Sequence, residues 1–131
     1  MYHLVWIADG DEEKTTFHTR YGLFEWLVIL EGLTNAPTSF QWFMNDVFSD
    51  MIDVSIVIYL DDILIYSNNP ADHCKHVKEV LRRLRKHGLL ACTNKCKFHS
   101  EQIEYLGYIL SPEGLSKDQA KVKVIQDWSK P

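Results

Sequence analysis

Two adjacent aspartates, Asp61 and Asp62, lie in the middle of the most apolar stretch of the chain, IVIYLDDILIYS. An ionised carboxylate is costly to bury without a partner, so a core position is unfavourable for either side chain. Successive residues of a strand point to opposite faces, so in mid-strand the two carboxylates could not share a ligand. At a tight turn, both can reach outward near one point. The stretch therefore predicts a β-hairpin with strands at about 56–60 and 62–66 and both aspartates at its tip.

A hairpin tip with two carboxylates suits a hard cation such as Mg²⁺, which proteins bind through oxygen ligands. The alternative is an ordinary polar turn. The favoured two-residue turns use Asn-Gly or Asp-Gly, however, and this tip has no glycine. Two like charges side by side also repel each other. The residues alone leave both a metal site and a plain turn open.

Helical patterns flank the expected hairpin. On one side, apolar residues that recur at helical spacing predict a helix over 36–51. On the other side, a second apolar stripe predicts a helix over 70–87, with Pro70 in its first turn and Gly88 at its end. The hairpin is therefore expected to pack against two helices.

Shorter patterns predict further strands and a last helix. Ser116 and Gln119 fit a capping box for a C-terminal helix that carries Ile125 and Trp128. Strands and helices do not alternate regularly, which predicts an α+β fold with a largely antiparallel sheet and helices packed on one face. Short apolar runs predict strands at 3–8, 14–17, 24–30, 89–93 and 103–110, with a turn at 111–114.

Length, composition and charge fit one soluble, intracellular domain with no membrane segment. The chain has 131 residues, 46% of them hydrophobic, and no apolar run approaches the roughly 18 residues of a membrane-spanning helix. The N-terminus lacks the basic start of a secretory signal, and three cysteines without a paired framework are typical of reduced thiols. A net charge of −4 argues mildly against a free-standing nucleic-acid binder, although a local basic face stays compatible with it.

Four ordered stretches resemble reverse transcriptases. YLDDILIYS, residues 59–67, looks like their Tyr-x-Asp-Asp box. FHTRYGLFEWLVI and GLTNAPTSFQWFMNDVF, residues 17–29 and 32–48, resemble the region before that box. HVKEVLRRLRKHGLLACTNKCKFHSEQIEYLGYILSPEGLS, residues 76–116, resembles the region after it. The chain is similar, over essentially its whole length, to the reverse transcriptase part of Pol polyproteins from gypsy-class LTR retrotransposons.

The resemblance implies a partial right-hand polymerase fold that joins dNTPs to a primer 3′-OH on an RNA or DNA template, using two Mg²⁺ or Mn²⁺ ions. It implies three regions: fingers-like strands at 1–35, palm at 36–110, and palm end with thumb start at 111–131. The expected partners are the primed template, dNTPs and the rest of the Pol polyprotein, namely upstream fingers and palm and downstream thumb and RNase H. The expected location is a cytoplasmic particle or the nucleus.

The same resemblance assigns roles to individual residues. Asp61 and Asp62 would be catalytic and would ligate the metal. A primer grip would comprise Leu106, Gly107 and Tyr108. Residues near the incoming nucleotide would be Tyr2, Glu31, Gly32, Tyr59 and Leu60.

Three departures from the family pattern bear on activity. Tyr2 matches the tyrosine that ends the family's Asp-Leu-x-x-x-Tyr pattern, so the first metal-binding aspartate is expected upstream of Met1. Leu30 and Glu31 replace a usual Pro-Phe pair, which would bring a carboxylate towards a triphosphate. Trp6 stands where a basic residue is common. The isolated chain is therefore expected not to polymerise, and a non-catalytic retroelement remnant that acts as a binding module is the alternative.

Three weaker signals stay open. The basic residues of 70–87 fit a solvated helix face, with contact to template phosphates as the alternative. Cys92, Cys96 and His99 have a loose spacing that gives only weak support for zinc. Ser67 has no evident histidine partner in the sequence, so the residues do not support nucleophilic catalysis.

Overall fold

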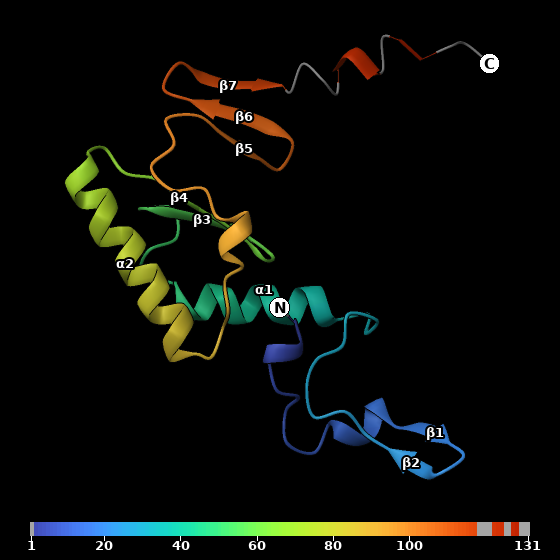
Figure 1. Ribbon diagram of the computed structural model, residues 1–131. Helices are drawn as coiled ribbons and strands as arrows, with labels where there is room; N and C mark the ends of the chain where they lie inside the picture. Colours follow the sequence, from blue (N-terminus) through green and yellow to red (C-terminus); the bar gives the residue numbers. More distant parts are fainter. Residues whose placement is uncertain (1, 118–121, 125–126, 129–131) are drawn as a thin grey trace. The chain divides into compact units, whose positions relative to one another are not determined.

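The computed structural model describes residues 2–117, 122–124 and 127–128 (Figure 1). The chain divides into two compact units, Met1–Ala91 and Cys92–Pro131. The named strands form three separate antiparallel sheets, so the expected α+β class with antiparallel pairing is confirmed. The first unit contains η1 (Tyr2–Leu4), η2 (Glu12–Thr15), β1 (Phe17–Thr19), β2 (Gly22–Phe24), α1 (Ala36–Val47), β3 (Ile56–Tyr59), β4 (Asp62–Ile65) and α2 (Pro70–Lys86), and the second contains η3 (Thr93–Lys95), β5 (Ile103–Tyr105), β6 (Tyr108–Ser111) and β7 (Gly114–Lys117).

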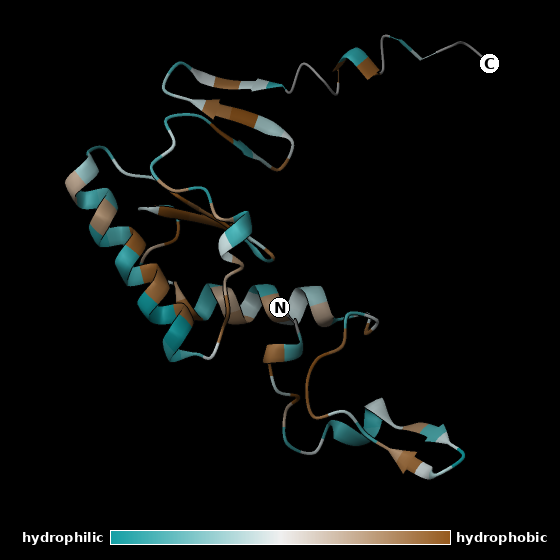
Figure 2. Ribbon diagram, viewed as in Figure 1, coloured by the Kyte–Doolittle hydropathy of each residue, from teal (hydrophilic) through white to brown (hydrophobic). Residues whose placement is uncertain are grey.

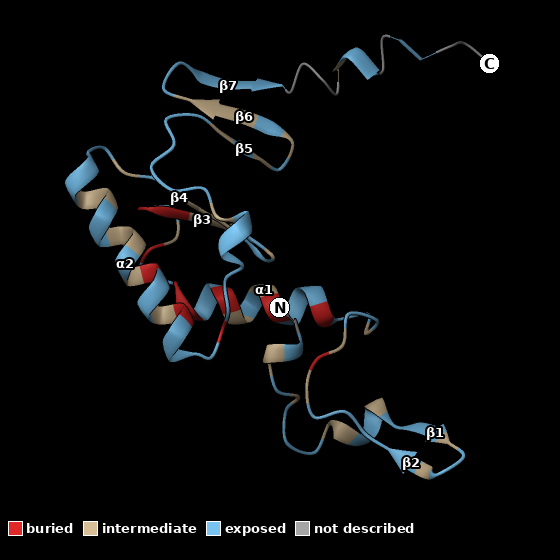
Figure 3. Cartoon of the chain, viewed as in Figure 1, coloured by how far each residue is buried: buried red, intermediate tan, exposed pale blue. Residues whose placement is uncertain are grey.

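The core of the first unit lies between α1, α2 and the β3–β4 hairpin. Figure 3 shows the buried residues concentrated on these elements. Phe40, Met44 and Val47 recur at helical spacing and form the buried face of α1. Helix α2 is more polar, and Figure 2 shows hydrophilic and hydrophobic residues alternating along it. The buried core residues of this unit are Phe40, Met44, Val47, Phe48, Met51, Ile56, Val80, Leu84 and Leu89.

The β3–β4 hairpin has one face on this core. Residues that pair across antiparallel strands share a face, and the pairs Ile56–Ile65 and Ile58–Ile63 both contact the core. The alternate pairs, Val57–Leu64 and Tyr59–Asp62, therefore lie on the opposite face. The predicted strands at 56–60 and 62–66 are confirmed, with each strand ending one residue earlier.

Local signals fix both ends of α2. At its start, the side chain of Asn69 accepts a hydrogen bond from the backbone N–H of Asp72 at 2.8 Å. At its end, Gly88 adopts a left-handed conformation with φ 69°. The N–H of Gly88 donates to Arg85 and that of Leu89 to the carbonyl of Leu84, at 3.2 and 2.9 Å. This is a Schellman arrangement, and it turns Leu89 back into the core.

An arginine joins the two helices. Arg83 of α2 forms a two-point contact with the carboxylate of Asp50, just after α1, and donates to the carbonyl of Val47 at 3.1 Å. It also donates to Glu79 at 2.7 Å, and its side chain is only 18% exposed. Hydrogen bonds from Arg83 lower the pKa of Asp50 to about 2. Hydrogen bonds from Arg82 and Arg83 likewise lower the pKa of Glu79 to about 2.

The expected strands near the N-terminus are largely wrong. Within 3–8, η1 ends at Leu4, and one isolated bridge pairs Trp6 with Val28. Within 14–17, η2 ends at Thr15, and only Phe17 belongs to a strand, β1. The hydroxyls of Thr15 and Thr16 donate to backbone carbonyls three residues earlier, at 2.6 and 2.5 Å. These local bonds compete with strand pairing and favour a helical turn. Of the strand expected at 24–30, only Phe24 belongs to β2.

The second unit is a three-stranded antiparallel sheet, β5–β6–β7. The predicted turn at 111–114 is confirmed, because Ser111 pairs with Gly114 across a two-residue connection. The expected capping box is wrong, since Ser116 lies on β7; its other member, Gln119, lies outside the described residues. The turn at 111–114 leads into β7, so Ser116 pairs with β6 instead of capping a helix. Residues 122–124 are helical and Trp128 is not, while Ile125 lies outside the described residues.

The strand expected at 89–93 is also wrong, because Leu89 belongs to the cap of α2 and η3 begins at Thr93. Among the described residues, no helix combines the length and the apolar character needed to cross a membrane.

Replacing Gly88 by alanine should destabilise the first unit by about 1–2 kcal/mol, because alanine is strained at this left-handed φ. No atom lies within 4 Å of an added Cβ there, so backbone strain is the whole expected effect. Gly32→Ala is the matched control, because that glycine also has open space but no left-handed φ. Urea unfolding of both variants measures the difference, and equal stability would contradict the assigned cap.

The stability of the first unit should fall as the pH drops from about 4.5 towards 2, where Asp50 and Glu79 take up protons. Both carboxyls have a lower pKa in the folded chain than in the unfolded chain, so they stabilise the fold above the unfolded pKa. Arg83→Met removes the main cause for Asp50 and the smaller of the two causes for Glu79, where Arg82 contributes more, so the variant should show a weaker pH dependence. Thermal unfolding of wild type and variant at several pH values measures this dependence. If the unfolding temperatures of both proteins fall in parallel as the pH drops, Arg83 does not couple the two carboxylates to folding.

Candidate active site at the β3–β4 turn

The β3–β4 turn is a tight, glycine-free connection. Tyr59 pairs with Asp62, which leaves Leu60 and Asp61 as the two connecting residues. Leu60 adopts a left-handed conformation with φ 52°. A branched, non-glycine residue in this conformation costs on the order of 1 kcal/mol, so the surrounding structure has to hold it there.

Both predicted aspartates lie at this turn and are exposed. Asp61 is in the connection and Asp62 is the first residue of β4. Among the described residues, no hydrogen bond or ion pair engages the side chain of Asp61. The turn therefore exposes two carboxylates on consecutive residues.

The charge of the surrounding sequence has the same sign. No lysine or arginine occurs between Arg20 and Lys75. No lysine or arginine of this stretch can therefore compete with a metal ion for the carboxylates. Its acidic residues are Glu25, Glu31, Asp46, Asp50, Asp53, Asp61, Asp62 and Asp72.

The donor set at the turn fits a hard divalent cation but is small. Carboxylate oxygens are the ligands that Mg²⁺ and Mn²⁺ take in proteins. In the described part of the chain, no group of three His, Cys, Asp or Glu residues is arranged to hold a metal ion. Asp61 and Asp62 can thus supply two ligands, and a bound ion would take its remaining ligands from water, from a substrate or from another segment.

A glutamine that the sequence did not single out contacts the turn. Gln41 of α1 accepts a hydrogen bond from the backbone N–H of Leu60 at 2.7 Å. Its amide nitrogen donates to Asn45 at 2.8 Å and to the carbonyl of Ile58 at 3.4 Å. A glutamine on a helix is usually a solvated polar residue, so the sequence carried no signal for this contact.

The residues predicted to line a nucleotide site come from three places in the first unit. Tyr59 and Leu60 belong to the turn itself, and Tyr59 is 54% exposed. Glu31 and Gly32 are exposed in the turn that precedes α1. Tyr2 lies in η1. No hydrogen bond or ion pair among the described residues joins Glu31 to the β3–β4 turn, so only part of the predicted set is brought together.

The predicted primer-grip residues form a turn in the second unit. Tyr105 pairs with Tyr108, and the connecting residues Leu106 and Gly107 both have left-handed φ values, 50° and 81°. Two such residues in succession are typical of the type I′ turn, which matches the twist of a hairpin. Tyr-Leu-Gly-Tyr and Tyr-Leu-Asp-Asp thus form two hairpin turns. In each turn, the first of the two connecting residues is a leucine with a left-handed φ.

The expectation that Ser67 lacks a histidine partner is wrong. Its hydroxyl lies 2.7 Å from Nδ1 of His76 and 3.4 Å from Nδ1 of His73, both on the first turns of α2. The sequence gives no sign of this contact, because it forms only when the chain reverses at Asn69 and brings the start of α2 towards Ser67. The hydroxyl is also 2.6 Å from the carbonyl of Tyr66, so local hydrogen bonds account for its placement.

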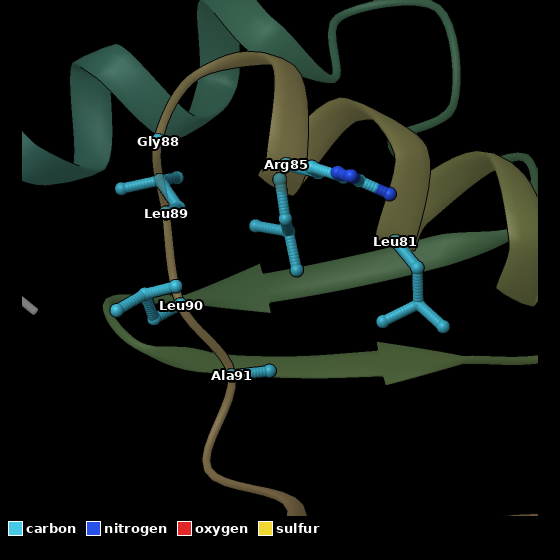
Figure 4. Close-up of a pocket in the computed structure, with 7 residues that line it drawn as sticks. Leu81, Arg85, Gly88, Leu89, Leu90 and Ala91 are labelled. Carbon is cyan, nitrogen blue, oxygen red and sulfur yellow. The ribbon is translucent and has the colours of Figure 1, made fainter.

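Three other features lie outside the turn. An apolar pocket of about 300 Å³ lies at the end of α2, where Figure 4 shows Leu81 and Leu90 among the side chains that line it. On α2, Lys75 and Arg82 form ion pairs with Asp72 and Glu79 on the exposed surface. The cysteines are free thiols, and Cys96 donates to the carbonyl of Cys92.

Comparison with known sequences identifies the family. Residues 1–110 match the family described as "Reverse transcriptase (RNA-dependent DNA polymerase)". The chain is 38% identical over 130 residues to the Transposon Tf2-3 polyprotein of Schizosaccharomyces pombe, and 37% identical to the Tf2-7 polyprotein of the same yeast. Each alignment covers 99% of this chain and 10% of the relative. The chain thus spans about a tenth of the length of these curated relatives.

Comparison with solved structures supports the same fold. The foamy viral protease-reverse transcriptase in complex with dsDNA matches with a TM-score of 0.82 over 96% of this chain and 26% of that chain. The same viral protein in complex with an RNA/DNA hybrid matches with a TM-score of 0.81 over 96% of this chain and 17% of that one. Both are 21% identical, so they bear on the fold alone. With a family match over most of its length and a Tyr-Leu-Asp-Asp hairpin turn, the chain belongs to the reverse transcriptase family.

Proposed function

We propose that this chain is the palm segment, with part of the fingers and the start of the thumb, of an RNA-directed DNA polymerase. The observation that carries the proposal is the exposed Asp61–Asp62 pair at a two-residue turn of a reverse transcriptase family member. The reaction is nucleotidyl transfer from dNTPs to a primer 3′-OH on an RNA or DNA template.

In this proposal, the two aspartates hold the catalytic metal. When bound, Mg²⁺ or Mn²⁺ supplies the positive charge that stabilises the attacking 3′-oxygen and the leaving pyrophosphate. The chain's own contribution is to present two carboxylates from a hairpin that packs on the core it shares with α1 and α2. Fixed ligand positions matter because a misplacement of about 1 Å can cost on the order of 100-fold in rate.

Other residues have binding roles in the proposal. Tyr59 and Leu60 lie beside the aspartates and line the site of the terminal base pair and the incoming nucleotide. Tyr2, Glu31 and Gly32 complete the nucleotide side. Residues 106–108 grip the primer.

The regions and partners follow from the family. Residues 1–35 would be fingers-like, 36–110 palm, and 111–131 the palm end and thumb start. The partners would be a primed template, dNTPs and the remaining parts of a Pol polyprotein. The relatives are transposon polyproteins, which supports an intracellular site of action, in a cytoplasmic particle or in the nucleus.

The test is primer extension on an RNA template by a chimera. In the Transposon Tf2-3 polyprotein, the segment aligned with this chain is replaced by residues 1–131. We expect extension that needs Mg²⁺ and that falls at least about 100-fold in Asp61→Asn, because a metal ligand is lost. Asp53→Asn is the matched control, since Asp53 is exposed and lies outside the turn, and asparagine tolerates its left-handed φ of 61°.

Equal extension by the Asp61→Asn and Asp53→Asn chimeras would contradict the proposed catalytic role. A chimera that does not extend primers but binds a primed template, with affinity that falls steeply with salt, would instead support a non-catalytic binding module. The isolated chain should not extend primers, since it supplies two carboxylates at the turn and no third ligand among its described residues.

Glu31 should limit the activity of the chimera. If it lies near the triphosphate, repulsion between unit charges about 4 Å apart is roughly 4 kcal/mol at an effective dielectric constant of 20. A third of that energy changes a rate about tenfold. Glu31→Phe should therefore raise kcat/KM, mainly by lowering KM for dNTPs. Glu31→Gln separates charge from packing, and equal kcat/KM for all three proteins would place Glu31 away from the nucleotide.

A further inference from the structure

The side chain of Gln41 links helix α1 to the turn that carries the two aspartates. It is half-buried, and its carbonyl oxygen accepts from the backbone N–H of Leu60 at 2.7 Å. The distance is short for an N–H···O bond, which indicates a close contact. This bond spans nineteen positions of sequence, so it ties the turn to the helix rather than to its own strands.

The amide of Gln41 can adopt only one of its two orientations. Its nitrogen donates to Oδ1 of Asn45 at 2.8 Å and lies 3.4 Å from the carbonyl oxygen of Ile58. A flipped amide would place its NH₂ group against the N–H of Leu60 and its oxygen against the carbonyl of Ile58. Both contacts would then be repulsive. The backbone groups of Leu60 and Ile58 therefore fix the orientation of the Gln41 amide, and the bond to Asn45 holds its nitrogen in place. Gln41 thus presents its oxygen to the turn.

The N–H that donates to Gln41 belongs to Leu60, the turn residue whose backbone conformation is strained. Leu60 holds a left-handed φ of 52° without the freedom of glycine. Asp61 and Asp62 follow it directly, so the backbone angles of Leu60 set the direction in which both carboxylates leave the hairpin. A hydrogen bond to its N–H offsets part of the strain of about 1 kcal/mol.

We infer that Gln41 is a positioning residue for the Asp61–Asp62 pair, and that it acts through the Leu60 amide. The inference deepens the proposed function and rests on it for the identity of the ligand, a divalent cation. Its structural part, the restraint of the turn by Gln41, stands apart from that function and can be measured alone.

The experiment uses the 131-residue chain and two NMR readouts. The first is the hydrogen exchange rate of the Leu60 amide, with the Val80 amide in the core as the reference for the fold. The second is a titration with Mn²⁺ alone, followed by the paramagnetic broadening of signals at the β3–β4 turn. Gln41→Leu removes the acceptor, Gln41→Glu keeps an acceptor oxygen, and Gln102→Leu makes the same chemical change at an exposed position.

Gln41→Leu should speed exchange at Leu60 roughly two- to tenfold, as expected for one lost hydrogen bond, while Val80 keeps its rate. The same variant should weaken Mn²⁺ binding at the turn about two- to fivefold. Gln41→Glu should keep the slow exchange at Leu60, and Gln102→Leu should change neither readout. A purely structural role would instead change Leu60 and Val80 in parallel.

Asn45→Ala keeps the inference testable if Gln41→Leu does not fold, because Asn45 is exposed and its loss only frees the Gln41 amide. It should speed exchange at Leu60 about twofold. Unchanged exchange and Mn²⁺ affinity in the folded variants would overturn the inference. If Asp61→Asn leaves the Mn²⁺ broadening unchanged, the proposed metal site fails, while the exchange data still decide whether Gln41 restrains the turn.

Discussion

The packing of one face of the β3–β4 hairpin on two helices is the constraint on which the candidate site depends. Four isoleucines, at 56, 58, 63 and 65, contact the core from that face. Because side chains alternate along a strand, burying these four places Tyr59 and Asp62 on the opposite face. A shift of one residue in the register would bury the carboxylate of Asp62, which is costly without a partner. The apolar core thus determines where the charged turn lies.

Charge is divided between regions of the first unit. The stretch from Tyr21 to Cys74 has eight acidic residues and no lysine or arginine, whereas α2 has six basic residues and two acidic ones. Part of the basic charge of α2 is used within the fold, where Arg83 bridges Asp50 and Glu79. Lys78, Arg85 and Lys86 have no ion pair among the described residues. The turn is therefore an acidic point, and the solvent-facing side of α2 keeps basic groups for phosphates or solvent.

Sequence patterns predicted the elements whose signals are local. The hairpin and both helices follow from apolar periodicity, although α1 ends at Val47 and not at 51 as expected. The end of α2 follows from Gly88. Patterns failed where another local signal competed. The threonine hydroxyls at 15 and 16 favoured a helical turn over a strand. The turn at 111–114 continued the sheet through β7 as far as Lys117, so Ser116 lies on a strand and not at the start of a helix.

The candidate site was predictable only in part. The adjacent aspartates were evident because charge in an apolar run is unusual. The contact of Gln41 with Leu60 was not, because it joins residues from different elements and a helical glutamine has no distinguishing pattern. The same holds for Ser67 and His76, which meet only because the chain reverses at the start of α2. Contacts of this kind require the tertiary structure.

The claim that the β3–β4 turn binds a divalent cation can be tested most directly by mapping where the ion lies. Fe²⁺ can replace Mg²⁺, and with ascorbate and peroxide it generates hydroxyl radicals that cut the backbone beside the bound ion. The account predicts cleavage at residues 60–62, suppressed by excess Mg²⁺ and lost in Asp61→Asn. Cleavage confined to other candidate ligands, such as His73 and His76 or Cys92 and Cys96, would contradict it.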